Sequence, residues 1–126
     1  MSETAAILFA IVTGLVIAFQ LALAAGAPWG DYAMGGAFSG RMPAPMRAAA
    51  VVQAAVLAGI AVVVLSGAGL LIPSLVESTP WLVWVPVALS GVAVLLNAAT
   101  RSAGEKRLWL PVTIVLLTTS VLVAIT

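Results

Sequence analysis

The stretch AAAVVQAAVLAGIAVVVLSGAGLLI, residues 48–72, contains no charged side chain and is bounded by Arg47 and Pro73. An α-helix needs about 20 predominantly apolar residues to cross the hydrocarbon core of a bilayer. Further uncharged apolar runs of similar length cover residues 5–25, 81–99 and 108–125. We therefore predict an all-α, polytopic membrane protein in which four transmembrane helices form a single bundle domain over residues 1–126.

The composition agrees with a chain embedded in lipid and excludes most soluble classes. Of the 126 residues, 63% are hydrophobic and 7% are charged, and the mean hydropathy is +1.25. A soluble domain is about half apolar and about a quarter charged. The net charge of +1 provides no basic surface for nucleic acid. The chain has no cysteine and no histidine, so we predict no disulfide, no metal site and no cofactor.

The first apolar run has an alternative interpretation as a cleaved signal peptide. Residues 22–24, Ala-Leu-Ala, resemble a small-residue cleavage site. A signal peptide begins with a basic segment, however, whereas residues 1–4 contain an acidic side chain and no cation. The apolar run is also long for the hydrophobic region of such a peptide. We therefore expect residues 5–25 to form a spanning helix.

The cationic side chains predict the orientation of the bundle. They all fall in the two connections that share one side of a four-span chain, and they are Arg41, Arg47, Arg101, Lys106 and Arg107. Because cation-rich short loops stay in the cytoplasm, this side is predicted to be cytoplasmic and both termini are predicted to lie outside. The protein is then a multi-pass protein of the bacterial plasma membrane. For Arg47 and Lys106 we expect no role beyond topology.

The connection between the first two spans, residues 26–47, is unusually long. Connections of more than about 12–15 residues in compact domains are typically functional or disordered. Aromatic and methionine side chains give this one an apolar character, and its glycines allow tight turns. We therefore expect an ordered cytoplasmic loop that contacts residues 97–107. Its Trp29 is a candidate site residue, whereas we expect interfacial anchoring from Trp81, Trp84 and Trp109.

Three amide side chains interrupt the apolar runs at a similar depth. Gln20, Gln53 and Asn97 each lie close to the predicted cytoplasmic end of their span, roughly 6–9 Å into the helix at about 1.5 Å per residue. Unpaired amides are costly in hydrocarbon, so we expect these three to face one another or a ligand. The two alternatives are an interhelical hydrogen-bond clamp and the floor of a polar pocket.

Charged side chains of the two cytoplasmic loops would surround such a pocket. We expect the third span to extend through Arg101, which then shares a helical face with Asn97 and lies near Glu105. A rim with several cations favours an anionic headgroup. The candidate ligand site consists of Gln20, Trp29, Asp31, Arg41, Gln53, Asn97, Arg101, Glu105 and Arg107.

Two loop motifs resemble those of a known group of proteins. Residues 26–30 read GAPWG, and residues 97–107 read NAATRSAGEKR. Together they resemble a family of small bacterial four-span membrane proteins with a GAPWG loop and an N-x-x-[ST]-R-S-x-x-E-[KR]-R loop. The resemblance covers most of the chain. It implies that the two loops form a joint site, and it implies no substrate and no activity.

The residue types favour a binding protein over a catalyst. Without histidine or cysteine, the candidate acids and bases on the cytoplasmic side are few and show no metal-binding spacing, so we predict no catalytic residue. A coupled transporter normally carries an ionisable residue within a span, and none of the predicted spans has one. We therefore predict a protein that binds a membrane lipid or another amphiphile. The alternative is a non-catalytic accessory subunit of a larger membrane complex; a small transporter or membrane enzyme is less favoured, and small-residue helix faces permit a homo-oligomer.

Overall fold

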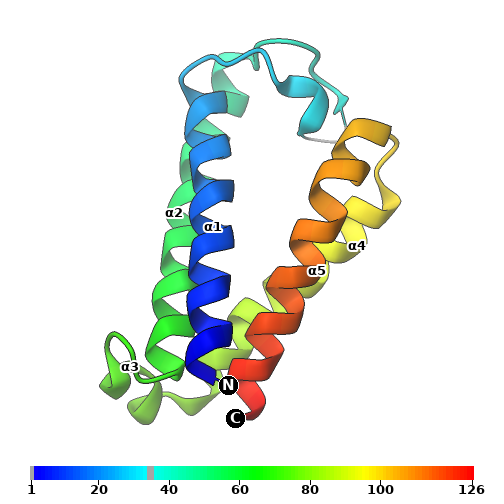
Figure 1. Ribbon diagram of the computed structural model, residues 1–126. Helices are drawn as coiled ribbons and strands as arrows, with labels where there is room; N and C mark the ends of the chain where they lie inside the picture. Colours follow the sequence, from blue (N-terminus) through cyan, green and yellow to red (C-terminus); the bar gives the residue numbers. More distant parts are fainter. Residues whose placement is uncertain (1, 34–35) are drawn as a thin grey trace.

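The computed structural model describes residues 2–33 and 36–126, which form helices and connecting segments without a strand (Figure 1). Four helical segments are long and apolar enough to cross a membrane. They are α1 (Ser2–Ala24), α2 (Ala44–Gly67), η3 with α4 (Pro80–Val83 and Trp84–Ala99), and α5 (Ala103–Ile125). The shorter helices are η1 (Gly30–Tyr32) and α3 (Pro73–Ser78). The predicted all-helical fold with four helices of spanning length is confirmed.

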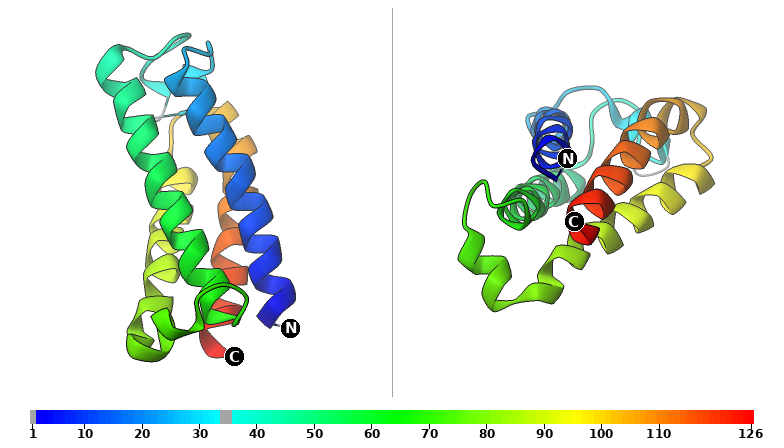
Figure 2. Two further views of the ribbon diagram at one scale, coloured as in Figure 1. Left: turned by 90° about the vertical axis from the view of Figure 1, so that its left-hand side faces the viewer. Right: turned by 60° about the horizontal axis from the view of Figure 1, so that its bottom comes forward.

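The long helices form two hairpins. α1 packs along α2, α4 packs along α5, and the main contact between the hairpins is α1 with α5, whereas α2 and α4 touch little. The hairpins converge at the end that holds α3 and both chain termini, and they diverge toward the opposite end (Figures 1 and 2). We call this opposite end the loop end, because it carries the long loop over residues 25–43. Residues 34 and 35 of that loop lie outside the described residues.

The hairpins are joined by a core of interlocking apolar side chains near the termini. Its buried members are Ala5, Ala6, Phe9, Ile60, Val64, Leu116 and Val123. The helices approach one another closely here because Gly67 has no side chain. A Cβ at this position would lie 3.0 Å from Val83 Cγ1 and 3.1 Å from Val123 Cγ1. In lipid, such close packing holds helices together, because lipid tails are as apolar as the side chains themselves.

The second long helix ends earlier than its apolar run predicts. The run continues to Ile72, but α2 ends at Gly67. Gly69 has a φ of +79°, and the Leu70 N–H donates to the Leu65 carbonyl at 2.9 Å. A glycine in the left-handed conformation with this backbone bond is a common helix end. The chain therefore turns before Pro73, which begins α3 instead.

The fourth long helix begins earlier than predicted, at Ala103 and not at Leu108. Ser102 is its N-cap, and the Glu105 N–H donates to Ser102 Oγ at 3.1 Å. The sequence signal is the Ser-x-x-Glu pattern that typically opens a helix. As a result, Glu105 belongs to the first turn of a long helix, and Pro111 lies inside that helix.

The expected extension of the third span through Arg101 is wrong. α4 ends at Ala99, and Thr100 has extended backbone angles, with φ −62° and ψ 144°. Arg101 lies in the exposed connection that follows. It therefore does not share a helical face with Asn97.

The small-residue face of α1 does not pack within the protein. Gly14 is exposed, and no neighbouring helix atom lies within 4 Å of the place where its Cβ would stand. Ala18, one turn further along the same face, is exposed as well. The buried face of α1 instead includes Ala6, Phe9 and Thr13.

A buried hydroxyl on α1 gives a stability prediction. Thr13 is 0% exposed, and its Oγ1 has no hydrogen-bond partner among the described residues. Thr13→Val keeps the shape and removes the hydroxyl, so we expect the free energy of unfolding to rise by about 1 kcal/mol. Thr13→Ala also removes a packed methyl group, so we expect it to lower the stability. Thermal unfolding in detergent measures both variants, and a lower Tm for Thr13→Val would contradict the prediction.

Candidate functional site

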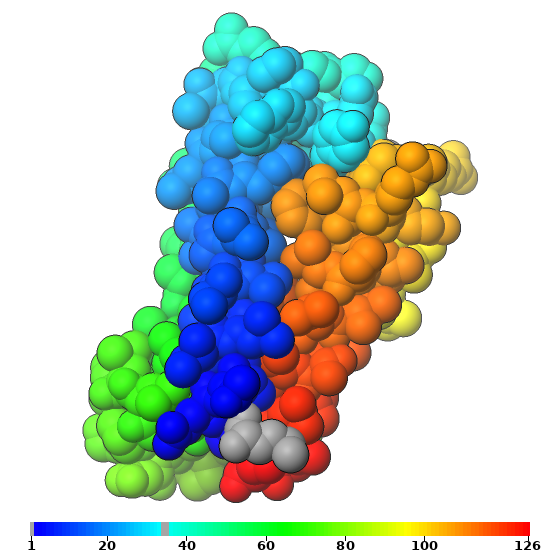
Figure 3. All heavy atoms as spheres, in the orientation of Figure 1, coloured from blue at the N-terminus to red at the C-terminus, as the bar shows by residue number. Residues whose placement is uncertain are grey.

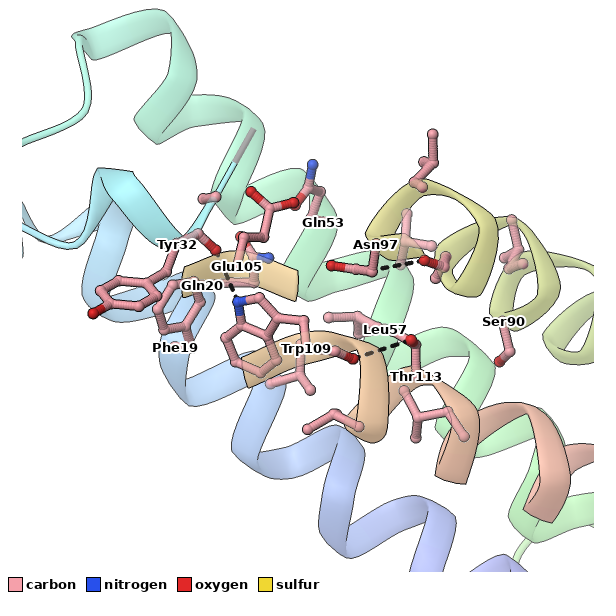
Figure 4. Close-up of a pocket in the computed structure, with 18 of the residues that line it drawn as sticks. Phe19, Gln20, Tyr32, Gln53, Leu57, Ser90, Asn97, Glu105, Trp109 and Thr113 are labelled. Carbon is pink, nitrogen blue, oxygen red and sulfur yellow. Dashed lines mark hydrogen bonds between the residues drawn. The ribbon is translucent and has the colours of Figure 1, made fainter. Parts of the chain in front are cut away.

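The divergence of the hairpins leaves a cavity of about 600 Å³ between them (Figure 4). All four long helices contribute to its wall, and Tyr32 and Ala33 of the long loop line it at the loop end. Along α5 the wall runs from Glu105 to Leu116, which corresponds to roughly 16 Å of helix at about 1.5 Å per residue. Small-molecule sites typically have volumes of about 300–1,000 Å³, so the cavity is large enough for a ligand.

Each helix presents one face to the cavity. Residues three or four apart lie on the same side of a helix, and the lining residues recur at this spacing on every wall, in several places together with an adjacent residue. The principal ones are Val16, Phe19 and Gln20 on α1, Gln53, Leu57 and Ile60 on α2, Ser90, Ala93 and Asn97 on α4, and Glu105, Trp109, Thr113 and Leu116 on α5. Gln20, Gln53, Asn97 and Glu105 lie toward the loop end (Figure 4). Leu57, Ile60 and Leu116 line the interior, to which Ser90 and Thr113 add hydroxyl groups.

The three predicted amides come together in this cavity. Gln20, Gln53 and Asn97 all line it, and Glu105 joins them there. The amides do not form the hydrogen-bond clamp, because Asn97 Nδ2 donates to the Ala93 carbonyl of its own helix at 2.8 Å. Among the described residues, no hydrogen bond joins the three amides to one another. The polar pocket, the other sequence-based alternative, therefore describes their arrangement better than the clamp.

Arg41, a predicted site residue, and Arg47, for which we expected no role beyond topology, both lie at the C-terminal end of α1. Arg47 Nε donates to the Ala24 carbonyl at 2.8 Å, and this carbonyl belongs to the last turn, where intrahelical partners are missing. The Arg41 guanidinium lies over Gly26, where a Cβ would come within 2.7 Å of Arg41 Nη2. Positive charge at a helix C-terminus is favourable, so both side chains stabilise the end of α1.

The other predicted cations also lie outside the cavity. Arg101, Lys106 and Arg107 are exposed, and none of them lines its wall. Arg107 instead borders a shallower depression together with Tyr32. None of the lysines and arginines of the chain therefore lines the cavity that the amides share.

Asp31 and Trp29 are held in the long loop outside the cavity. Asp31 lies in η1 with an exposed side chain. Trp29 is 44% exposed and stacks on Phe19, with ring centroids 5.8 Å apart. Of the nine predicted site residues, the structure thus brings Gln20, Gln53, Asn97 and Glu105 together at one cavity and leaves the other five around it.

Two hydrogen bonds join the long loop to the start of α5. Ser102 Oγ donates to the Asp31 carbonyl at 2.7 Å, and Trp109 Nε1 donates to the Tyr32 carbonyl at 2.8 Å. The expected contact between this loop and residues 97–107 is therefore present. In the space-filling view, atoms of the loop cover the loop end beside α5 (Figure 3). Trp109 holds the loop backbone and lines the cavity, and its expected role as an interfacial anchor stays a prediction.

Aromatic side chains continue from the loop into the cavity wall. Phe19 stacks on Trp29 and meets the edge of Trp109, with ring centroids 4.7 Å apart and an interplanar angle of 68°. Edge-to-face and stacked pairs are the favoured aromatic geometries. Phe19 was not predicted from the sequence, because nothing distinguishes it from its apolar neighbours. Ser102 was not predicted either, although the Ser-x-x-Glu pattern is a signal for its capping role.

The described residues offer no metal site. Within residues 2–33 and 36–126, no group of three His, Cys, Asp or Glu side chains could hold a metal ion. What the cavity provides is hydrogen-bonding groups and one carboxylate at the loop end, above a mainly apolar interior. This arrangement suits binding of an amphiphilic molecule.

No protein-family model matches the chain, and no curated protein and no solved structure shows significant similarity to it. The resemblance of the two loop motifs to small bacterial four-span membrane proteins therefore stays a prediction.

Proposed function

We propose that this protein is a small integral membrane protein that binds a lipid or another amphiphile between its two helical hairpins. The observation that carries the proposal is the cavity of about 600 Å³, which has its amides and its carboxylate at one end and a mainly apolar interior. Such a cavity matches a molecule with a polar head and an apolar tail. The location that we propose is the bacterial plasma membrane, with the loop end in the cytoplasm.

The position of the cavity supports entry of the ligand from the bilayer. Several lining residues are also well exposed at the outer surface of α2 and α4, and they are Val52, Val56, Leu89 and Leu96. Because α2 and α4 touch little, the wall between them is open. In a membrane this opening faces lipid tails, so an amphiphile reaches the cavity without crossing water.

The test of the proposal is a variant that fills the cavity. Ala93 lines the α4 wall, and Ala93→Trp places a large side chain in the space that a ligand tail would occupy. We expect the wild-type protein, purified in mild detergent, to carry a stoichiometric lipid adduct in native mass spectra. We expect the adduct to decrease by about tenfold or more in the variant, since a steric cost of about 1.4 kcal/mol already changes affinity tenfold.

The matched control is Ala88→Trp on the same helix. Ala88 is exposed and lies outside the cavity wall, so the same substitution there leaves the adduct unchanged. Wild-type protein without any adduct, or an equal adduct in Ala93→Trp, would contradict the proposal.

One observation favours the accessory role as a second candidate. Gly14 and Ala18 form an exposed small-residue face on α1, and such faces allow a second helix to approach closely in a membrane. A partner protein or a second copy recovered at fixed stoichiometry from mild detergent, and lost in Gly14→Leu, would support this role.

A further inference from the structure

We propose that the ligand of the cavity carries an uncharged hydrogen-bond acceptor, such as a carbonyl oxygen, part-way along its apolar tail, and that this acceptor binds the hydroxyl of Ser90. The inference rests on the proposed binding of an amphiphile and adds a feature of its tail. A ligand of this kind differs from a plain hydrocarbon chain by one polar group, which lies roughly 10 Å from the head.

The hydroxyl of Ser90 is buried and has no partner. Ser90 is 3% exposed, and its Oγ makes no hydrogen bond among the described residues. A buried hydroxyl without a partner costs free energy. A serine in a helix can avoid this cost by donating to a carbonyl three or four residues earlier, and Ser90 does not do so. Its hydroxyl is therefore available to a bound molecule.

Other buried hydroxyls of the protein are bonded within their own helix. In α5, the hydroxyls of Thr113, Thr119 and Ser120 each donate to a carbonyl three or four residues earlier. Thr13 is the one further buried hydroxyl without a partner among the described residues, and it does not line the cavity. Ser90 thus combines an unpartnered hydroxyl with a place in the cavity wall.

Ser90 lies on the face of α4 that lines the cavity. Ala93 and Asn97 line it as well, and a separation of three and seven residues keeps these side chains on one side of the helix. In Figure 4 the Ser90 hydroxyl extends from α4 toward the side on which Thr113 of α5 lies. Because the hydrogen of a hydroxyl rotates to suit its partner, Ser90 can donate to a molecule in the cavity.

The position of Ser90 along α4 predicts where the acceptor lies in the ligand. Asn97 stands toward the loop end, and Ser90 is one face and seven residues further into the bundle, which is roughly 10 Å at about 1.5 Å per residue. A head among the amides therefore places the middle of a long tail beside Ser90. Leu57, Ile60 and Leu116 line this interior, where a charged group is costly to bury, so we expect the acceptor to be uncharged.

The test compares hexadecanol with three isomeric forms that carry one ketone, placed near the hydroxyl head, near the middle of the chain or near its far end. Each probe is titrated into the intact protein in maltoside micelles, and bound probe is measured by native mass spectrometry. We expect the mid-chain ketone to bind about tenfold more tightly than the other three probes, because it alone brings an acceptor to the depth of Ser90. A tenfold change corresponds to about 1.4 kcal/mol, which is close to the net value of one hydrogen bond.

The variant Ser90→Ala removes the donor and leaves the shape of the wall nearly unchanged. We expect it to lose the preference for the mid-chain ketone and to bind hexadecanol as the wild type does. An isotope-labelled ketone gives an independent readout, because a hydrogen bond lowers the infrared stretching frequency of a carbonyl group. We expect the lowered frequency in the wild-type protein and not in Ser90→Ala.

The matched control is Ser120→Ala. Ser120 is also buried, but its Oγ donates to the Leu117 carbonyl at 3.0 Å, and it lies outside the cavity wall. The same substitution there leaves the order of the four probes and the carbonyl frequency unchanged.

The outcomes separate this inference from the proposed function. Equal binding of the four probes, or tightest binding of another isomer, would overturn the inference and leave the proposed function standing. A mid-chain preference that survives in Ser90→Ala would overturn it as well. If none of the four probes binds, the proposed function fails and the inference fails with it. Should Ser90→Ala not fold, the order of the probes and the carbonyl frequency in the wild-type protein decide.

Discussion

Substitution of Gly30 by alanine is expected to disrupt the long loop and to lower the free energy of unfolding by about 2–3 kcal/mol, the upper range for forced overpacking. Gly30 is buried, and its N–H donates to the Gly40 carbonyl at 2.8 Å. A Cβ at Gly30 would overlap the Phe38 carbonyl oxygen and lie 2.7 Å from the Gly40 carbonyl oxygen. Backbone atoms cannot rotate away as a side chain can, so the loop segment around Gly30 must separate from the segment of residues 38–40.

The consequence extends to the cavity, because Gly30 is the first residue of η1. Separation of the loop moves Asp31 and Tyr32, whose carbonyls accept the hydrogen bonds from Ser102 and Trp109. We therefore expect faster hydrogen exchange at the amides of Tyr32 and Ala33 together with a lower Tm.

Gly14→Ala is the matched control for Gly30→Ala. It makes the same chemical change at an exposed helical glycine with free space around it. Alanine is favoured over glycine in a helix, so this variant keeps or slightly raises the Tm. A Tm and an exchange pattern equal to wild type in Gly30→Ala would contradict the close contact between Gly30 and Phe38.

The proposed orientation in the membrane predicts an all-or-none labelling result. The chain has no cysteine of its own, so single cysteines report their position cleanly. Ser39 is exposed in the long loop, and Thr126 is exposed at the C-terminus. In intact bacterial cells we expect a membrane-impermeant maleimide to label Thr126→Cys fully and Ser39→Cys not at all, because the loop end carries all five cations.

Two controls complete the labelling experiment. Ser78→Cys lies at the exposed end of α3, on the same side as the termini, and is expected to react like Thr126→Cys. Permeabilised cells are expected to label all three positions. Reaction of Ser39→Cys from outside intact cells would reverse the proposed topology.

The distance of the amide residues from the ends of their helices could be predicted from the sequence. The side-chain partners of the predicted residues could not. Gln20, Gln53 and Asn97 were expected at one level because each lies a similar distance from the end of its span, and they do line one cavity. The role of Arg47 could not be predicted from the sequence. Its guanidinium contacts Ala24, which is 23 residues earlier in the chain, and no local pattern signals such a contact.

Two helix boundaries were predicted wrongly, because they were placed by hydropathy alone. The start of α5 was missed, although Ser102 and Glu105 have the spacing of a helix-capping pair. The end of α2 was placed too late because the apolar run continues through Gly69, where a positive φ turns the chain. In both cases hydropathy dominated the prediction and backbone conformation decided the outcome.

The sequence by itself determined the number of long helices and their approximate positions. A spanning helix satisfies its own backbone hydrogen bonds and needs only a sufficient apolar length, and both are local properties of each segment. The tertiary structure alone decided which helix faces meet, and it places Gln20, Gln53, Asn97 and Glu105 around one cavity and the arginines outside it. A helix that is apolar all round carries no pattern that marks its packed side. That choice depends on how side-chain shapes fit across the hairpins, as at Gly67 against Val83 and Val123, and shape complementarity exists only once the helices are assembled.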